Sequence, residues 1–171
     1  MESIANALED EKRAYAHGAN RPLGPYLGTL GAYAGAVGGL MLAAKLLGRR
    51  PPTVKLGDLA LMTVATHKIS RTITKDPVMS PLRAPFTRYK GTSGPAELAE
   101  EPRTEEGKTK HALGELVVCP FCTAQWVATA YVAGLTFAPQ LTRLAGATMT
   151  AVAGSDWLQL AYARLQQAAE G

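Results

Sequence analysis

Charge is distributed very unevenly along the chain, and this feature constrains the fold most. Residues 26–44 contain no Asp, Glu, Lys or Arg, and neither do residues 59–67, 123–137 and 144–155. A helix of about 20 predominantly apolar residues is long enough to cross the hydrocarbon core of a bilayer. The pattern therefore predicts an all-α fold, an integral membrane helical bundle with about four transmembrane helices.

The chain divides into six predicted segments. They are a polar N-terminal segment, cytoplasmic or interfacial (1–24); a Gly-rich transmembrane helix (25–48); a second transmembrane helix with a polar stripe (56–75); a cytoplasmic basic or interfacial segment with a mobile loop (76–118); a third transmembrane helix that starts at a Cys-x-x-Cys (119–138); and a fourth (141–166). The loop at 91–112 is predicted to be mobile because it is polar and has little to bury. The second helix is short, so it either spans the bilayer or only dips into it.

The basic residues predict the orientation. Lys and Arg gather in the N-terminal segment and in the loop between residues 74 and 113, and loops rich in these residues stay in the cytoplasm. We therefore expect a multi-pass membrane protein with both termini cytoplasmic. The net charge of +4 comes from basic residues beside apolar spans, which favours a lipid bilayer rather than nucleic acid as the partner.

The first apolar span carries small residues at a spacing of four. Gly31, Gly35 and Gly39 fall on one face of the predicted helix. Small side chains let helix backbones approach closely in lipid. We expect this stripe to pack against another membrane helix, in a homo-oligomer or in a larger membrane complex.

Several polar side chains are predicted to meet near the cytoplasmic face. At about 1.5 Å of rise per residue, Arg71 lies about one turn from that face, and Asp156, Gln125 and His67 lie about two turns deep. Ionisable residues at that depth are costly unless they are paired. Arg71 and Asp156 are therefore the expected ion pair, with His67 or Gln125 bonding the remaining polar atoms. Such a pair can also serve only to lock two helices together.

The two cysteines of the chain, Cys119 and Cys122, form a Cys-Pro-Phe-Cys motif. Cys119 occupies the expected N-cap of the third span, with Pro120 at the first helical position. Three interpretations are open: packed thiols, a redox-active dithiol, or half of a zinc site. Zinc would need further ligands, from His67, from His111 or from the cysteines of a second copy. No cofactor is expected, and zinc is the less favoured alternative.

A series of short motifs extends from the second span to the fourth. They begin with His67-Lys-Ile-Ser-Arg71-Thr-Ile-Thr-Lys-Asp76, and continue with Ser80-Pro-Leu-Arg83-Ala-Pro85-Phe, Gly114-Glu115-Leu, Cys119-Pro-Phe-Cys122-Thr-Ala-Gln-Trp126 and Ser155-Asp156. In this order they resemble the DUF1360 family of small bacterial membrane proteins, over about Leu56 to Leu165. The family is uncharacterised, and some members carry a sporulation-protein label.

The resemblance implies an integral protein of the bacterial cell membrane and supplies no activity. It marks the following motif residues: Arg71, Asp76, Arg83, Glu115, Cys119, Cys122, Trp126 and Asp156. Two features depart from the family pattern. The Gly-rich first span looks like an N-terminal addition, and the loop at 91–112 is long.

Two functional hypotheses follow from the sequence. The first is a non-enzymatic membrane scaffold or assembly subunit that packs through the glycine stripe. The second is a thiol redox or metal-sensing membrane protein that uses Cys119 and Cys122. A small transporter is less favoured, because four spans without an internal repeat leave little room for a substrate path.

Overall fold

The computed structural model describes residues 2–19 and 21–170. Most of the described chain is helical. Its elements are α1 (Glu2–Ala16), α2 (Leu23–Leu46), α3 (Leu56–Lys75), the 3-10 helix η1 (Pro77–Met79), α4 (Ser80–Arg83), β1 (Thr87–Gly94), β2 (Glu97–Pro102), α5 (Lys108–Val118), α6 (Pro120–Phe137) and α7 (Pro139–Glu170). The four long helices lie close to the four predicted spans. The small sheet corrects the prediction that the fold is entirely helical.

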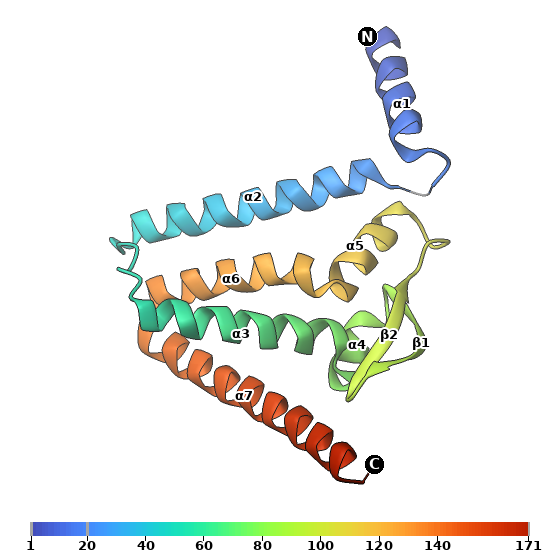
Figure 1. The fold of residues 1–171 in the computed structure, drawn as a ribbon. Coiled ribbons are helices and arrows are strands. Elements are labelled where there is room, and N and C mark those ends of the chain that lie inside the picture. Colours follow the sequence, from blue (N-terminus) through green and yellow to red (C-terminus); the bar gives the residue numbers. More distant parts are fainter. Residues whose placement is uncertain (1, 20, 171) are drawn as a thin grey trace.

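The long helices alternate in direction between two ends of the molecule (Figure 1). At one end lie the β-hairpin, α4 and α5, and we call this the hairpin end. There α2 and α6 begin and α3 finishes, while α7 slants away from the other helices towards the same side (Figure 1). The turns from α2 to α3 and from α6 to α7 lie at the opposite end.

Three of the four long helices form the core. Ala65 of α3 and Tyr131 and Leu135 of α6 are buried, and Met62, Ile69 and Met149 pack against them. In contrast, α2 has no buried residue. It contacts α5 and α6 and lies beside the three-helix core rather than within it.

Close helix packing occurs at glycines other than the predicted stripe. A Cβ built on Gly134 of α6 would lie 2.5 Å from the Thr142 hydroxyl of α7, and one built on Gly146 of α7 would overlap the Tyr131 hydroxyl of α6. These two glycines let α6 and α7 approach each other. A Cβ on Gly31, Gly35 or Gly39 would meet nothing within 4 Å. Among the described residues the stripe packs against no other helix, so its packing against another chain stays a prediction.

The prediction of a mobile loop at residues 91–112 is wrong for most of that segment. Strands β1 and β2 pair antiparallel, with Thr87 opposite Pro102 and Tyr89 opposite Glu100. Pro95 and Ala96 connect them, and Ala96 has a φ of 57°, in the left-handed region. The end of the predicted loop belongs to α5.

Ion pairs explain why this polar segment is ordered. Its acidic residues contact basic residues of α3, α4, β1, α5 and the segment after β2. The pairs are Arg71–Glu97, Arg83–Glu100, Lys90–Glu101, Arg88–Glu105, Arg103–Glu106 and Lys110–Glu106. Polarity alone predicted disorder, because composition does not reveal that charges far apart in sequence face each other.

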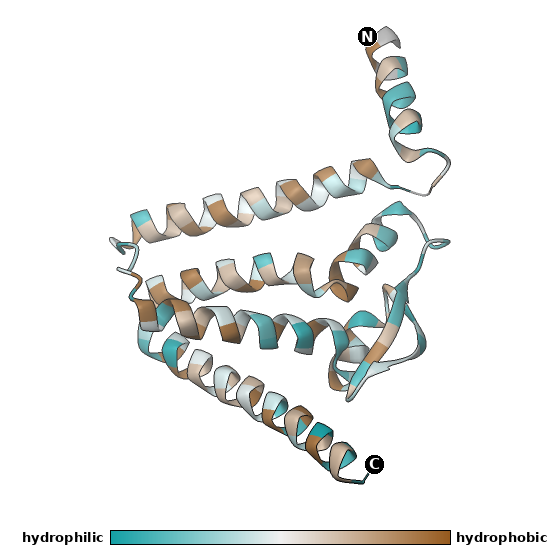
Figure 2. Cartoon of the chain, in the orientation of Figure 1, coloured by the Kyte–Doolittle hydropathy of each residue, from teal (hydrophilic) through white to brown (hydrophobic). Residues whose placement is uncertain are grey.

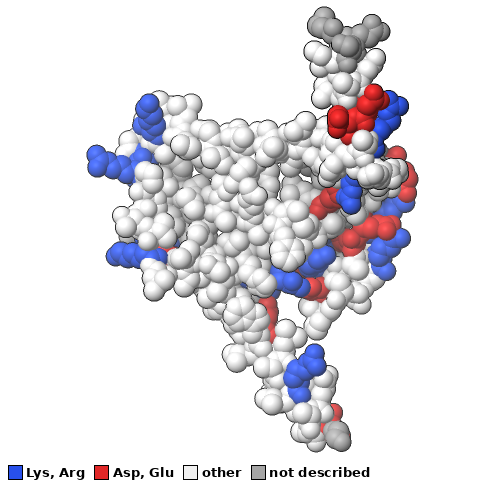
Figure 3. Space-filling model, turned by 45° about the horizontal axis from the view of Figure 1, so that its top comes forward, with Lys and Arg blue, Asp and Glu red and all other residues white. Residues whose placement is uncertain are grey.

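The described residues contain one helix, α2, that is long and apolar enough to cross a membrane by itself. The pair α5 and α6, joined at a bend of 77°, passes the same test when it is taken as one broken span. Apolar residues run along the whole length of α2 (Figure 2). On the face shown in Figure 3, charged side chains gather towards the two ends of the helices, with a broad uncharged band between them.

Candidate functional site: a thiol pair beside a pocket

The Cys-Pro-Phe-Cys motif forms the corner between α5 and α6. Cys119 has extended backbone angles (φ −99°, ψ 106°), and its Sγ accepts a hydrogen bond from the Cys122 N–H at 3.3 Å. The Thr123 hydroxyl donates to the Leu116 carbonyl at 2.8 Å across the corner. Cys119 is therefore the N-cap and Pro120 the first helical residue, as the sequence predicts.

Both thiols are free. Cys119 is half-buried and Cys122 is exposed. Phe121 between them points outward with 89% of its surface exposed. The structure thus presents Cys122 at the surface of the chain rather than packed in the core.

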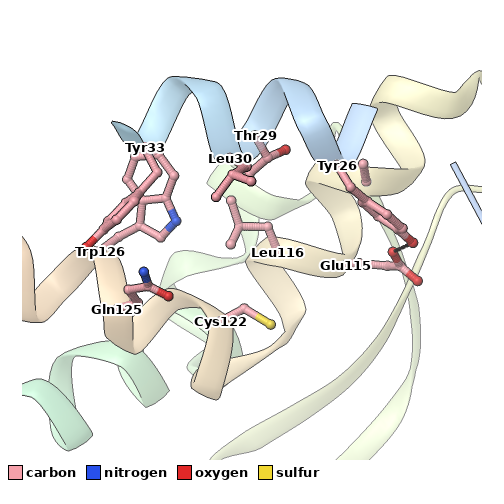
Figure 4. Close-up of a pocket in the computed structure, with 10 residues that line it drawn as sticks. Tyr26, Thr29, Leu30, Tyr33, Glu115, Leu116, Cys122, Gln125 and Trp126 are labelled. Carbon is pink, nitrogen blue, oxygen red and sulfur yellow. Dashed lines mark hydrogen bonds between the residues drawn. The ribbon is translucent and has the colours of Figure 1, made fainter. Parts of the chain in front are cut away.

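Cys122 borders a pocket of ≈ 320 Å³ between α2, α5 and α6. Its walls are mainly apolar and aromatic, with a few polar groups. The lining residues are Tyr26, Thr29, Leu30, Tyr33, Ala112, Glu115, Leu116, Cys122, Gln125 and Trp126. Figure 4 shows the α2 residues along one wall, and Cys122, Gln125 and Trp126 of α6 along the other.

Glu115 closes one end of the pocket. Its carboxylate accepts a hydrogen bond from the Tyr26 hydroxyl of α2, drawn in Figure 4. It also accepts one from the Arg21 guanidinium at 3.1 Å, and His111 Nε2 lies 3.5 Å away. This motif residue therefore ties the start of α2 to α5.

The other end of the pocket is closed by aromatic packing. The rings of Tyr33 and Trp126 meet edge to face, with their centroids 5.1 Å apart. The hydroxyls of Tyr33 and Thr129 lie 2.8 Å apart, within hydrogen-bonding distance. Since α2 has no buried residue, it is held at these two places, and the pocket lies between them.

A second polar cluster lies under the hairpin. The side chains of Arg83 and Glu100 are 1% and 6% exposed, and Arg83 Nε donates to Glu100 Oε2 at 2.8 Å. Arg83 also donates to the Ile73 carbonyl at 2.8 Å, and Glu100 accepts from the hydroxyls of Thr87 and Ser80 at 3.1 and 3.3 Å. Arg83 thereby links α3, α4 and β2.

The surroundings of Glu100 set its ionisation. Burial raises the pKa of its carboxyl group, but the hydrogen bond and charge of Arg83 and the hydroxyls of Thr87 and Ser80 lower that pKa more, so it lies below its usual value. The carboxylate therefore stays ionised at neutral pH. Its polar partners are all supplied by the chain, which indicates a structural clamp.

The predicted ion pair between Arg71 and Asp156 is wrong. Arg71 Nε donates to Glu97 Oε1 at 2.8 Å, and Asp156 instead accepts from Lys68 Nζ at 2.7 Å. The prediction failed because it treated the segment around Glu97 as a mobile loop, whereas the hairpin folds back onto the end of α3. Lys68, nearly one turn before Arg71, then pairs with Asp156 of α7 in place of Arg71.

The remaining predicted residues are dispersed. Gln125 lines the pocket, whereas the His67 ring faces Trp157 of α7 with centroids 6.4 Å apart. Asp76 is the N-cap of η1 and accepts from the Val78 N–H at 2.9 Å. Within residues 2–19 and 21–170, no three His, Cys, Asp or Glu side chains gather as a metal site would require.

Sequence reasoning missed an ion pair at the opposite end. Arg143 at the start of α7 donates to Asp58 at the start of α3, with Nε–Oδ1 at 2.6 Å and Nη2–Oδ2 at 3.0 Å. The sequence contained a signal for this pair. Both residues lie in the first turns of helices that were predicted to begin at the same membrane face.

The fold and the site define a small helical-bundle protein with a hairpin-covered end and a Cys-x-x-Cys at a helix corner. Residues 61–162 match the DUF1360 family, described as a protein of unknown function, and the chain belongs to that family. No curated protein and no solved structure matches the chain. The matched residues include the hairpin, α5 and α6, whereas α2 lies outside them.

Proposed function

We propose that the protein is a multi-pass protein of the bacterial cell membrane, with α2, α3, α6 and α7 as its four spans. The observation that carries this proposal is the small share of apolar residues inside the fold. Among the described residues the buried apolar side chains are Ala65, Ala112, Val127, Tyr131, Leu135 and Ala153. Soluble monomers rarely leave large contiguous apolar patches exposed to water.

Each proposed span presents exposed apolar side chains. Leu42 of α2 is 57% exposed, Leu59 of α3 46%, Val132 of α6 42% and Leu144 of α7 65%. At about 1.5 Å per residue, α2, α3 and α6 measure about 36, 30 and 27 Å, and a hydrocarbon core is about 30 Å thick. These lengths and surfaces suit lipid as the surrounding solvent.

The charges give the proposed orientation. Most of the Lys and Arg residues of the chain lie in α1, before α2, in the second half of α3 and at the hairpin end, and such residues favour the cytoplasmic side. The basic side chains of Lys68 and Arg71 in α3 are paired with Asp156 and Glu97, which lowers the cost of placing them near lipid. Both termini would then be cytoplasmic.

Single-cysteine labelling tests this topology. In a Cys119→Ser/Cys122→Ser background, Thr53→Cys probes the turn between α2 and α3, and Ser93→Cys probes β1. A membrane-impermeant maleimide should label Thr53→Cys in intact cells, and Ser93→Cys only after the cells are permeabilised. Labelling of both in intact cells, or recovery of the protein without detergent, would refute the proposal.

Within the membrane, we propose a non-enzymatic role as an assembly subunit that associates through α2. The support is that α2 has no buried residue and that its glycine stripe is open. Gly35→Leu should reduce the mass of the detergent-solubilised assembly, measured by light scattering, because it fills the stripe. Ala36→Leu, about 100° around the helix, is the control. An unchanged mass in Gly35→Leu rules the stripe out as an interface.

A second proposed function is a thiol redox protein, and the position of Cys122 at a pocket favours it. In cells, Cys119→Ser/Cys122→Ser should leave assembly unchanged under the subunit role alone. Under the redox role it should abolish a phenotype that depends on this protein. Since serine is also a good N-cap, the double variant keeps the helix corner.

A further inference from the structure

The pocket beside Cys122 is composed of two parts of the chain. One wall belongs to α5 and α6, within the family-matched residues, and the other belongs to α2, outside them. Without α2, Cys122 would face open surroundings. With α2 in place, the thiol borders a pocket that is lined in part by aromatic side chains (Figure 4).

The lining selects the chemistry of a ligand. The pocket volume, ≈ 320 Å³, lies at the lower end of the range for small-molecule sites. The pocket has an apolar and aromatic surface that suits a flat ring. This surface is formed by Leu30, Leu116, Tyr33 and Trp126. The Gln125 side chain supplies an amide that can donate to a ring carbonyl.

A cationic ligand fits this pocket poorly. Glu115 is the only acidic side chain in the lining, and its carboxylate already contacts Arg21, Tyr26 and His111. An amine would have to displace these partners. A neutral ring with acceptor oxygens needs no such exchange.

We propose that this pocket binds a lipophilic quinone, which oxidises the dithiol of Cys119 and Cys122. The inference deepens the thiol redox function and rests on it and on the membrane setting. On the cytoplasmic side such a disulfide would be transient, as in redox sensors. The pair would then report how oxidised the quinone pool of the membrane is.

The reaction balances in two steps. The Cys122 thiolate adds to a ring carbon of the quinone, and an S–C bond forms as the electron pair moves to a carbonyl oxygen, which takes up a proton. The Cys119 thiolate then attacks Cys122 Sγ. The S–S bond forms, the S–C bond breaks, and its electron pair moves through the ring to the second carbonyl oxygen, which takes up the second proton. Two thiols lose two electrons and two protons, and the quinone becomes a quinol.

The test uses reduced, full-length protein in lipid vesicles without oxygen. Decylubiquinone is added, and free thiols and quinol are followed over time. Thr29→Trp places an indole in the pocket from the α2 wall. Leu27→Trp places the same side chain two residues away on α2, at a residue that is 69% exposed and does not line the pocket. Diamide, a water-soluble thiol oxidant, is the parallel reagent.

The wild type and Leu27→Trp should lose both thiols and yield one quinol per chain. Thr29→Trp should react at least about tenfold more slowly, equivalent to about 1.4 kcal/mol, and all three should react alike with diamide. If the quinone oxidises the thiols of the two tryptophan variants at equal rates, the proposal that the quinone binds in this pocket is overturned. Failure of diamide to form the disulfide would instead overturn the thiol redox function itself.

A trapped intermediate tests the chemistry separately. In Cys119→Ser the second thiol is absent and the S–C bond cannot be broken by it, so the quinone ring should stay bonded to Cys122 Sγ, seen as an increase in protein mass equal to one quinone. Serine preserves the N-cap. An unmodified Cys122 after reaction with quinone would overturn the covalent route.

Discussion

The buried pair of Arg83 and Glu100 should be the most sensitive point of the hairpin end. We predict that Glu100→Gln destabilises the hairpin strongly, whereas Glu101→Gln, one residue along β2, does not. Both substitutions remove one negative charge and nearly preserve shape. They differ in surroundings: Glu100 is 6% exposed beside Arg83, while Glu101 is 45% exposed beside Lys90.

The geometry gives the magnitude. At 2.8 Å between Nε and Oε2, the attraction of two unit charges is about 6 kcal/mol at an effective dielectric constant of about 20. Part of this is offset because the amide no longer requires the desolvation of a carboxylate. Removing one partner of a buried pair typically costs about 3–5 kcal/mol, and we expect about 3, since the glutamine oxygen still accepts from Arg83. The exposed pair of Lys90 and Glu101 contributes about 0–1 kcal/mol to the stability of the hairpin.

Hydrogen exchange of the amides in β1 and β2, measured in detergent, is a suitable assay, because it reports the free energy of local opening. A loss of about 3 kcal/mol speeds exchange by about two orders of magnitude. Glu101→Gln should change exchange by less than about fivefold. If the two variants exchange alike, the assignment of the pair as the main clamp of the hairpin is refuted.

Three further predictions concern single positions. Ala96→Gly should stabilise the hairpin by about 1 kcal/mol in the same exchange assay, because glycine adopts the φ of 57° at this position without strain. Amide exchange as fast as in the wild type, or faster, would contradict this. Gly146→Ala should destabilise the protein in thermal unfolding by about 1–3 kcal/mol, because the methyl group overlaps Tyr131, whereas Gly154→Ala, in open space on the same helix, should not. Lys110 and Arg103 lower the pKa of Glu106 from 4.5 to about 2. Its stabilising contribution is therefore present above pH 4.5 and lost as the pH falls towards 2, and a carbon NMR titration that gives an ordinary midpoint would contradict this.

The sequence predicted the long helices well because their signals are local. Cys119 and Pro120 mark the start of α6 by capping chemistry alone, and the charge-free stretches mark α2, α6 and α7. Asp76 and Pro77 likewise mark the turn at η1. Each of these signals depends on neighbours within a few residues.

The pairing of charges could not be predicted in the same way. Glu97 and Glu100 lie in a stretch with the composition of a disordered loop, and only the folded hairpin brings them to Arg71 and Arg83. The sequence shows that this segment contains many acidic and many basic residues. Which of them pair depends on a strand register that composition does not encode. The same limit applied to the pocket, since no pattern within α2 shows which of its faces meets α6.

The attachment of α2 by its first half has a mechanical consequence. Tyr26 and Tyr33 hold the part of the helix near the hairpin end, while the half towards Leu46 has no anchor among the contacts of the described residues. In the membrane setting that we propose, α2, at about 36 Å, exceeds the average thickness of the hydrocarbon core and should therefore tilt in the bilayer. A thinner membrane would increase that tilt. Because α2 is held near one end, the change in tilt would also change the geometry of the Tyr33–Trp126 contact.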